Sequence, residues 1–499
     1  MTRASAHAAR AAPGASRALG WSFLNTAVSR IGTLGIGIVL ARVLGPEAFG
    51  TYAVAFVALA AVLSFNELGV SLAIVRWEGD PRSIAPTVTT ISIAGSVLFF
   101  AAAYAAAEPF ARAMGDPEAT PVVRLLLVSV LVNGLVATPA ALLQRQFRQG
   151  TRMIVDQVNV WTGAIVSVVL AIAGLGAMSL AIGRIAGTLL SAVLFFVYSP
   201  LPYRLGWDRT LIRPLLTFGL PLAGASIVFF AVGYADQLIV GGVLGATMLG
   251  YYVLAFNLSS WPVSIFSQPL RSVAPAAFAR LQHTPHEMSA AFVALVRALS
   301  AVAVPVCFFI AGAAAPIVRF VYGEVWEPAA AALTWLALLA AFRILFELSY
   351  DYLVVVKRSA SLFAVQIIWL VALVPALALG ATGGEIAGVG LAQFVVAVLV
   401  VTPAYMWCLA RSGVRATAVL ARIWPAFGAG IVVFVLSRLG AEYIDSSFLA
   451  ALAGGLVALA ASALLLYRQR ATLAGLRHLG RPAEPVAPAA PPAAGGETS

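Results

Sequence analysis

The chain has 499 residues, of which 61% are hydrophobic and only 10% are charged. Soluble domains carry about 25% charged residues, so this composition predicts a polytopic, all-α membrane protein. The net charge of +11 does not indicate a nucleic-acid partner, because the basic residues stand singly between apolar runs. With two cysteines and four scattered histidines, no disulfide framework, metal site or cofactor is expected.

Runs of roughly 20 apolar residues predict the membrane spans, since that length crosses the hydrocarbon core. We predict fourteen spans, at about 20–43, 51–75, 86–107, 121–142, 154–175, 178–199, 214–240, 248–274, 289–311, 328–355, 360–380, 386–409, 417–438 and 447–467. None of the connecting loops is long enough to fold as a separate domain. The last segment, 468–499, is rich in Pro, Ala and Gly and is predicted to be a disordered tail.

The distribution of basic residues predicts the orientation. If residues 1–19 are cytoplasmic, the inner segments hold 22 of the 31 lysines and arginines and the outer segments hold five. A missed or invented span would invert every later loop and destroy this asymmetry. The positive-inside rule therefore supports fourteen spans with both termini in the cytoplasm.

A short sequence occurs twice, 200 residues apart. Residues 41–56 read ARVLGPEAFGTYAVAF and residues 241–256 read GGVLGATMLGYYVLAF, with the pattern VLG…G.Y..AF in common. Each copy joins the first two spans of a six-span set, and Gly45 and Gly245 are expected to end a helix in the left-handed conformation. Two similar lobes with the same orientation follow, at 20–205 and 206–410, and residues 411–467 add two further spans.

Around this repeat the sequence resembles a known family. The strings LARVLGPEAFGTYAVAF, ELGVSLAIVR, TFGLPLAGASIVFF and APAAFARLQ are similar to oligosaccharide-lipid (Wzx-like) flippases, which belong to the multidrug/oligosaccharidyl-lipid/polysaccharide exporter superfamily. The resemblance covers about residues 20–410.

The resemblance implies two six-helix bundles that form a V around a cavity with alternating access. The implied cargo is a polyprenyl-pyrophosphate-linked oligosaccharide, moved from the inner to the outer leaflet of the bacterial plasma membrane. Membrane lipids are the surrounding partners, and a polymerase and glycosyltransferases of the same pathway are possible partners. Such a protein is a transporter, not an enzyme.

Charges inside spans need a partner, a cavity or a function. Arg30 and Glu67 fall at similar depth on the first two spans. Arg30 is expected to face the cavity and bind pyrophosphate, because a guanidinium binds phosphate bidentately at any relevant pH. Glu67 is expected to hold Arg30 until cargo arrives. The alternative is a permanent ion pair that only joins two helices.

The tenth span carries Arg343, Glu347 and Asp351 at i, i+4 and i+8, hence on one helical face. Arg343 is a second candidate for pyrophosphate and Glu347 a candidate proton-coupling acid, unless the face forms only internal ion pairs. The resemblance gives Asp236 a structural or gating role. Arg184 lies nearer a span end and is interpreted as snorkelling to the interface.

Sugars need adaptable polar groups and aromatic faces. The candidate contacts are Asn25, Asn66, Asn257, Trp261 and Gln268. Two alternative functions stay open within the superfamily, a peptidoglycan-precursor flippase and a drug/cation antiporter. A membrane enzyme of polysaccharide assembly fits less well, because the outer loops are short and carry no catalytic constellation.

Overall fold

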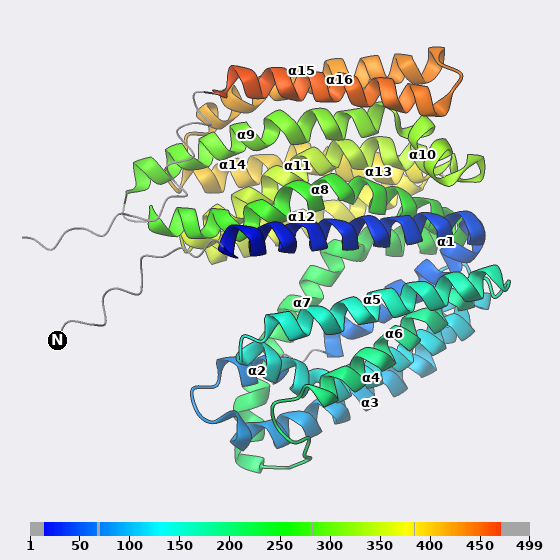
Figure 1. Cartoon of the computed structure of the whole chain (residues 1–499), viewed down its shortest axis with the longest axis vertical. Helices are drawn as coiled ribbons and strands as arrows, with labels where there is room; N and C mark the ends of the chain where they lie inside the picture. The colour runs from blue at the N-terminus through cyan, green and yellow to red at the C-terminus, as the bar shows by residue number, and fades with distance from the viewer. Residues whose placement is uncertain (1–13, 67–69, 282–283, 384, 471–499) are drawn as a thin grey trace, which may run out of the picture.

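The structure is a computed structural model that describes residues 14–66, 70–281, 284–383 and 385–470. Every regular element in these ranges is a helix (Figure 1). Side chains of residues 14–34 are not described, nor are those of Phe65, Asn66 and 268–277. The all-helical prediction is confirmed for this part of the chain.

The first six α-helices form one group, which we call the N-terminal bundle. Its members are α1 (Gly14–Asn66), α2 (Val70–Arg76), α3 (Pro81–Ala113), α4 (Thr120–Arg145), α5 (Gln149–Ile172) and α6 (Ala177–Val197), with the short helix η1 (Pro117–Ala119) between α3 and α4. The next helix, α7 (Arg209–Leu244), runs from this group to the second one (Figure 1).

The second group is the C-terminal bundle. It consists of α8 (Ala246–Arg280), α9 (Pro285–Gly312), α10 (Ala314–Tyr322), η2 (Glu324–Trp326), α11 (Ala329–Val355), α12 (Ser359–Ala381), α13 (Ile386–Val396), the π-helical η3 (Ala397–Val401), α14 (Thr402–Ala410), α15 (Ala416–Tyr443) and α16 (Ser447–Arg468). The last pair, α15 and α16, pack on α9.

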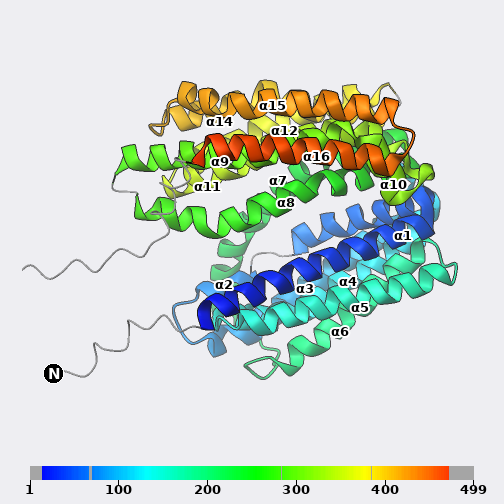
Figure 2. The same cartoon turned by 45° about the horizontal axis from the view of Figure 1, so that its top comes forward.

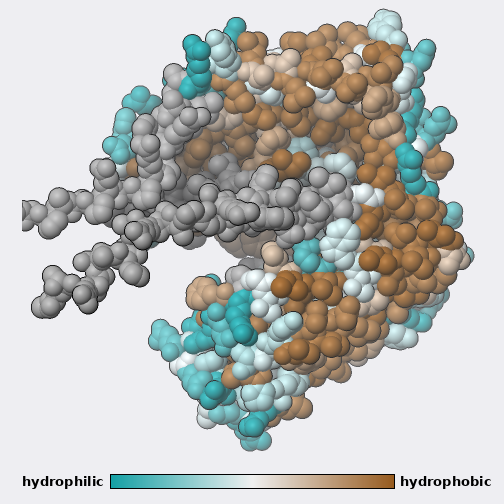
Figure 3. All heavy atoms as spheres, in the orientation of Figure 1, coloured by the Kyte–Doolittle hydropathy of each residue, from teal (hydrophilic) through white to brown (hydrophobic). Residues whose placement is uncertain are grey.

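Twelve segments of described residues are long and apolar enough to cross a membrane. They confirm a multi-pass membrane protein, but the predicted total of fourteen is not confirmed. One of the twelve, Gly35–Ser64, is a single segment although the kink at Gly45 lies inside it, and α8 is not among them. Brown, hydrophobic side chains cover much of the face in Figure 3, as lipid contact requires.

The two bundles converge at one end and diverge at the other. Figure 2 shows them apart where α1 begins and α16 ends, and close together where α1 bends next to α10. The converging end is the one that the charge distribution predicts to face outward.

The sequence repeat has the same backbone in both copies. Gly45 has φ 72° and ψ 173°, and Gly245 has φ 88° and ψ 173°. Positive φ is readily adopted only by glycine, so both positions require this residue. The ψ values are far from the left-handed helical value of about 47°, so each helix ends in an extended turn and not in the expected left-handed one.

The two copies also touch each other, which the sequence did not indicate. A Cβ on Gly50 would lie 2.1 Å from the Ala246 carbonyl oxygen, and a Cβ on Gly250 would lie 2.4 Å from the Pro46 carbonyl oxygen. Only glycine at both equivalent positions permits this approach. The copies therefore close the converging end by backbone-to-backbone contact.

Trp326 completes this closure from η2. Its Nε1 donates a hydrogen bond to the Ala41 carbonyl at 3.0 Å, and its ring lies edge-on to Phe49 at 5.5 Å and to Tyr251 at 5.8 Å. One buried side chain thus contacts α1 and α8 together. Arg42 adds hydrogen bonds to the carbonyls of Phe320 and Val321.

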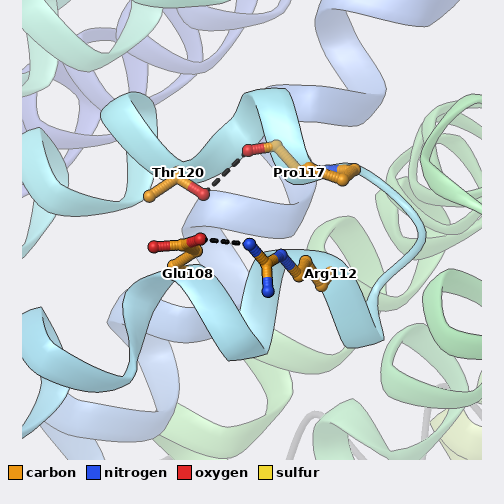
Figure 4. A network of polar contacts seen from close by, with 4 residues as sticks. All are labelled: Glu108, Arg112, Pro117 and Thr120. Carbon is orange, nitrogen blue, oxygen red and sulfur yellow. Dashed lines mark hydrogen bonds and ion pairs between the residues drawn. The ribbon is translucent and has the colours of Figure 1, made fainter.

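The turn between α3 and α4 packs on the same end, where a Cβ on Gly115 would lie 3.2 Å from the Cα of Gly245. Figure 4 shows four residues in and beside this turn. Glu108 and Arg112 form an ion pair there, and the Thr120 hydroxyl donates to the Pro117 carbonyl at 2.7 Å. The Thr51 hydroxyl of the first repeat copy donates to Asp116 in this turn at 2.7 Å. The α3–α4 turn therefore helps to fix the first copy in position.

Candidate functional site

A polar cavity of about 380 Å³ lies inside the N-terminal bundle. Its charged lining residues are Arg152, Asp156 and Arg184. The uncharged polar residues that line it are Ser71, Ser92, Ser96, Ser129, Asn133, Gln144, Asn159, Thr188 and Ser191. Hydroxyls and amides thus surround two arginines and one carboxylate within a hydrophobic bundle.

One face of α5 supplies the charged wall of this cavity. Arg152, Asp156 and Asn159 follow the helical spacing i, i+4, i+7. Arg152 donates from Nη1 to Gln144 Oε1 at 2.9 Å, while its Nε is 4.0 Å from Asp156 Oδ2. The long ion-pair distance leaves the guanidinium able to take a further acceptor.

Glycines let the helices around the cavity approach closely. A Cβ on Gly183 would lie 2.5 Å from the Gly163 carbonyl oxygen, and one on Gly187 would lie 2.3 Å from the Asn159 carbonyl oxygen. The backbone of α6 therefore rests directly on α5, as small residues allow in membranes. This packing places Thr188 and Ser191 of α6 opposite the polar face of α5.

Each copy of the repeat ends in a phenylalanine whose ring lies under an arginine guanidinium. The Arg184 guanidinium lies over the Phe56 ring at 5.8 Å, and the Arg343 guanidinium lies over the Phe256 ring at 5.3 Å. Both distances are within cation–π range. Arg184 lines the N-terminal cavity. Its interpretation as a residue that snorkels to the interface did not predict this place.

A buried hydrogen-bond network lies beside Arg343. Asp236 Oδ2 accepts from the Tyr252 hydroxyl at 2.8 Å and from Gln393 Nε2 at 2.7 Å, and Asp236 Oδ1 accepts from the backbone N–H of Gln237 at 2.8 Å. Asp236 is 2% exposed, and Arg343 interacts with it electrostatically. The network joins α7, α8 and α13.

The first repeat copy lacks this network. Tyr52 is the counterpart of Tyr252, but Ile36 stands where the second copy has Asp236. The structural position of Asp236, at a junction of three helices, agrees with a structural role and does not test gating.

The other predicted site residues are dispersed. Glu347 is half-buried on α11, one turn from Arg343 and close enough to Tyr405 for an electrostatic interaction. Asn257 is exposed and Trp261 is half-buried on α8. Glu67 and the side chains of Asn25, Arg30, Asn66 and Gln268 lie outside the described residues.

Sequence reasoning missed most of the N-terminal cavity. A signal was present, because Arg152, Asp156 and Asn159 share a face, as do Arg184, Thr188 and Ser191. Arg152 and Asp156 lie near the start of a span, so they do not stand out as charges in the middle of the membrane. The depth of a residue along its span does not show that the polar faces of two helices, here α5 and α6, meet.

Two solved transporter structures share this fold. The chain superposes on the lipid II flippase MurJ in an inward closed conformation with a TM-score of 0.75, 14% identity, and coverage of 90% of this chain and 99% of MurJ. It superposes on an inward-facing multidrug resistance MATE family transporter with a TM-score of 0.58, 14% identity, and coverage of 76% and 93%. The chain therefore has the fold that MurJ and this MATE family transporter share.

The sequence identifies the family. Residues 39–331 match the family described as polysaccharide biosynthesis protein, and the chain belongs to it. It is 26% identical over 377 residues to the succinoglycan biosynthesis transport protein ExoT of Rhizobium meliloti, covering 74% of this chain and 75% of ExoT. It is 22% identical to the lipopolysaccharide biosynthesis protein WzxC of Escherichia coli, covering 62% and 63%.

These findings confirm the resemblance seen in the sequence. The chain is a membrane transport protein of polysaccharide biosynthesis and not an enzyme.

Proposed function

We propose that the protein is a flippase for a polyprenyl-(pyro)phosphate-linked oligosaccharide. It moves this lipid from the inner to the outer leaflet of a bacterial plasma membrane for the assembly of a surface polysaccharide. A polymerase and glycosyltransferases of the same pathway act after and before it. The family membership supports the pathway, and the fold supports alternating access.

The observation that carries the proposal is the lining of the N-terminal cavity. Arg152 and Arg184 supply the fixed positive charge and the bidentate donors that a phosphate needs. Asn133, Asn159 and the serines supply uncharged donors and acceptors, which suit sugar hydroxyls. Asp156 keeps Arg152 oriented until an anion replaces it.

The residues of the membrane-crossing path have assigned roles in this proposal. Arg30 binds pyrophosphate together with Arg343, Glu67 holds Arg30 in the empty state, and Glu347 is a coupling acid. Asn25, Asn66, Asn257, Trp261 and Gln268 contact sugars.

The proposal also includes a topology. Fourteen spans cross the membrane, with α1 counted as two spans on either side of Gly45 and α8 counted as another. The lobes are residues 20–205 and 206–410, residues 411–467 form two additional spans, and both termini are cytoplasmic. The repeat contact at Gly50 and Gly250 then closes the outer end while cargo enters from the cytoplasm.

The test uses Arg152→Gln and Arg184→Gln in cells that depend on this protein for polysaccharide export. We expect each variant to reduce export and to accumulate lipid-linked oligosaccharide on the inner face. Each lost charge-assisted contact is worth about 1.5–3 kcal/mol, or roughly 10- to 150-fold in cargo affinity. Arg468→Gln is the matched control, because Arg468 is an exposed arginine at the end of α16.

Two outcomes would reject the proposal. Normal export by both well-expressed cavity variants would remove the cavity from the transport path. Accumulation of a peptidoglycan precursor in place of an oligosaccharide lipid would instead select the alternative cargo, which the fold similarity to MurJ keeps in view.

A further inference from the structure

A second cavity, of about 600 Å³, lies between α9 and α15. Arg297 and His286 line it from α9, and Arg415 and Arg422 line it from the start of α15. Ala290 and Ala418 are among its small lining residues. No aspartate or glutamate is among the described residues that line it.

The register of the two helices brings Arg297 and Arg422 to one level. Ser289 Oγ lies 3.5 Å from the Gly413 carbonyl oxygen, and a Cβ on Gly430 would lie 2.9 Å from Val304 and 3.1 Å from Phe308. Residues about 124 positions apart are therefore side by side along these parallel helices. Arg422 consequently lies beside Arg297.

This level is that of lipid headgroups. Arg422 follows the start of α15 by six residues, or about 9 Å along the axis. Trp424, two residues further, is 70% exposed, and Leu420 is 50% exposed on the same helix. An exposed tryptophan next to exposed apolar residues is typical of the boundary between headgroups and hydrocarbon.

Orientation rules explain basic residues at the cytoplasmic ends of helices but do not explain a cavity. Alanines on both helices keep this cavity open as a groove between α9 and α15, which larger side chains would close. We call it the α9–α15 groove. Arg415 and Arg422 are exposed, and neither forms an ion pair with another described residue. The groove thus combines room for a ligand with donors for an anion.

The position of the groove separates it from the cargo path. Figure 1 shows α15 and α16 on the side of the C-terminal bundle that is remote from α2–α6. Cargo phosphate between the bundles, or in the N-terminal cavity, would not reach it.

We propose that this groove binds the phosphate of an anionic phospholipid of the inner leaflet. Arg422 and Arg297 bind the phosphate oxygens, and Arg415 and His286 contact the rest of the headgroup. The acyl chains lie along the apolar surface of α15. Arginines bind phosphate bidentately, and basic pockets between membrane helices on the cytoplasmic side suit lipid headgroups.

The test measures lipid binding to the full-length protein purified in detergent, by native mass spectrometry. The probes are phosphatidylglycerol, phosphatidylcholine and inorganic phosphate. We expect phosphatidylglycerol to bind and the R415Q/R422Q variant to bind it about thirtyfold more weakly, the loss expected for two arginines near a membrane surface. R468Q/R470Q is the matched control, because it removes two arginines from the neighbouring helix end and should bind within about twofold of wild type.

A third variant keeps the test decisive if R415Q/R422Q folds poorly. Ala418→Leu fills the groove and leaves every charge in place, and it should also weaken phosphatidylglycerol binding. Equal weakening in both double variants would overturn the proposal, because it would show a general charge effect. Equal binding of phosphatidylcholine, or displacement of the lipid by inorganic phosphate at the same concentration, would overturn it as well. Because transport is not measured, the result is independent of the proposed cargo.

Discussion

Replacing Gly250 by alanine tests whether the repeat contact closes the transporter. The added Cβ would lie 2.4 Å from the Pro46 carbonyl oxygen, whereas ordinary contact begins at 3.4 Å. The helices must therefore separate by about 1 Å at this point. The nearest atoms, in Pro46 and Gly50, all belong to the backbone, so no side-chain rotation relieves the clash. Overpacking of this kind costs about 1–3 kcal/mol, which shifts a closed-to-open ratio by roughly 5- to 150-fold.

A buried cysteine reports the shift. Val54 is fully buried and lies one helical turn from Gly50, so Val54→Cys is accessible from the converging end only when the contact opens. Both natural cysteines, Cys307 and Cys408, are buried and can be replaced by alanine. We expect an impermeant maleimide added outside to label Cys at 54 about 5- to 150-fold faster in the Gly250→Ala protein.

A matched glycine on α7 controls for the loss of a glycine as such. A Cβ on Gly233 would have no atom within 4 Å, so Gly233→Ala should leave labelling unchanged. If Gly250→Ala folds and its labelling rate equals that of Gly233→Ala, the copies do not form the closure and the reasoning fails.

Two further predictions concern stability. Tyr252→Phe removes a hydrogen bond to buried Asp236 and should destabilise the purified protein by about 1–3 kcal/mol. Tyr52→Phe should lower the melting temperature less than Tyr252→Phe, because the Tyr52 hydroxyl makes no hydrogen bond with a described residue. Equal decreases in melting temperature would contradict this difference between the two tyrosines. At the start of α7, hydrogen bonds from the Thr210 hydroxyl and backbone lower the pKa of Asp208. A lowered pKa gives stability that is present above the usual pKa and lost as the pH falls through the lowered one. The melting difference between wild type and Asp208→Ala should therefore shrink in acid, and a pH-independent gap would refute the charge contribution.

The repeat predicted a glycine-dependent turn at two positions, because such a turn depends on backbone chemistry. The structure gives Gly45 and Gly245 positive φ angles of 72° and 88°. The contact between Gly50 and Gly250 could not be predicted, since nothing in either copy indicates that the other is its partner.

The N-terminal cavity was harder to predict for a different reason. In a soluble helix, apolar residues mark the buried face, but in a membrane both the lipid-facing and the buried faces are apolar. Helix rotation is then poorly defined by the sequence, and Arg184 could equally face lipid headgroups or an interior. Only the packing of α6 on α5, through Gly183 and Gly187, decides that it lines the cavity.

The meeting of Gly50 with Gly250 brings two equivalent positions of the sequence repeat into direct contact. Such a contact is isologous, as in a symmetric dimer, because the same patch appears on both sides. Outside this contact the equivalent positions differ, as Ile36 and Asp236 show. At the contact each glycine is part of the other copy's surroundings, so a larger side chain in either copy fills the same gap. A substitution at one of the two positions therefore acts on both copies at once.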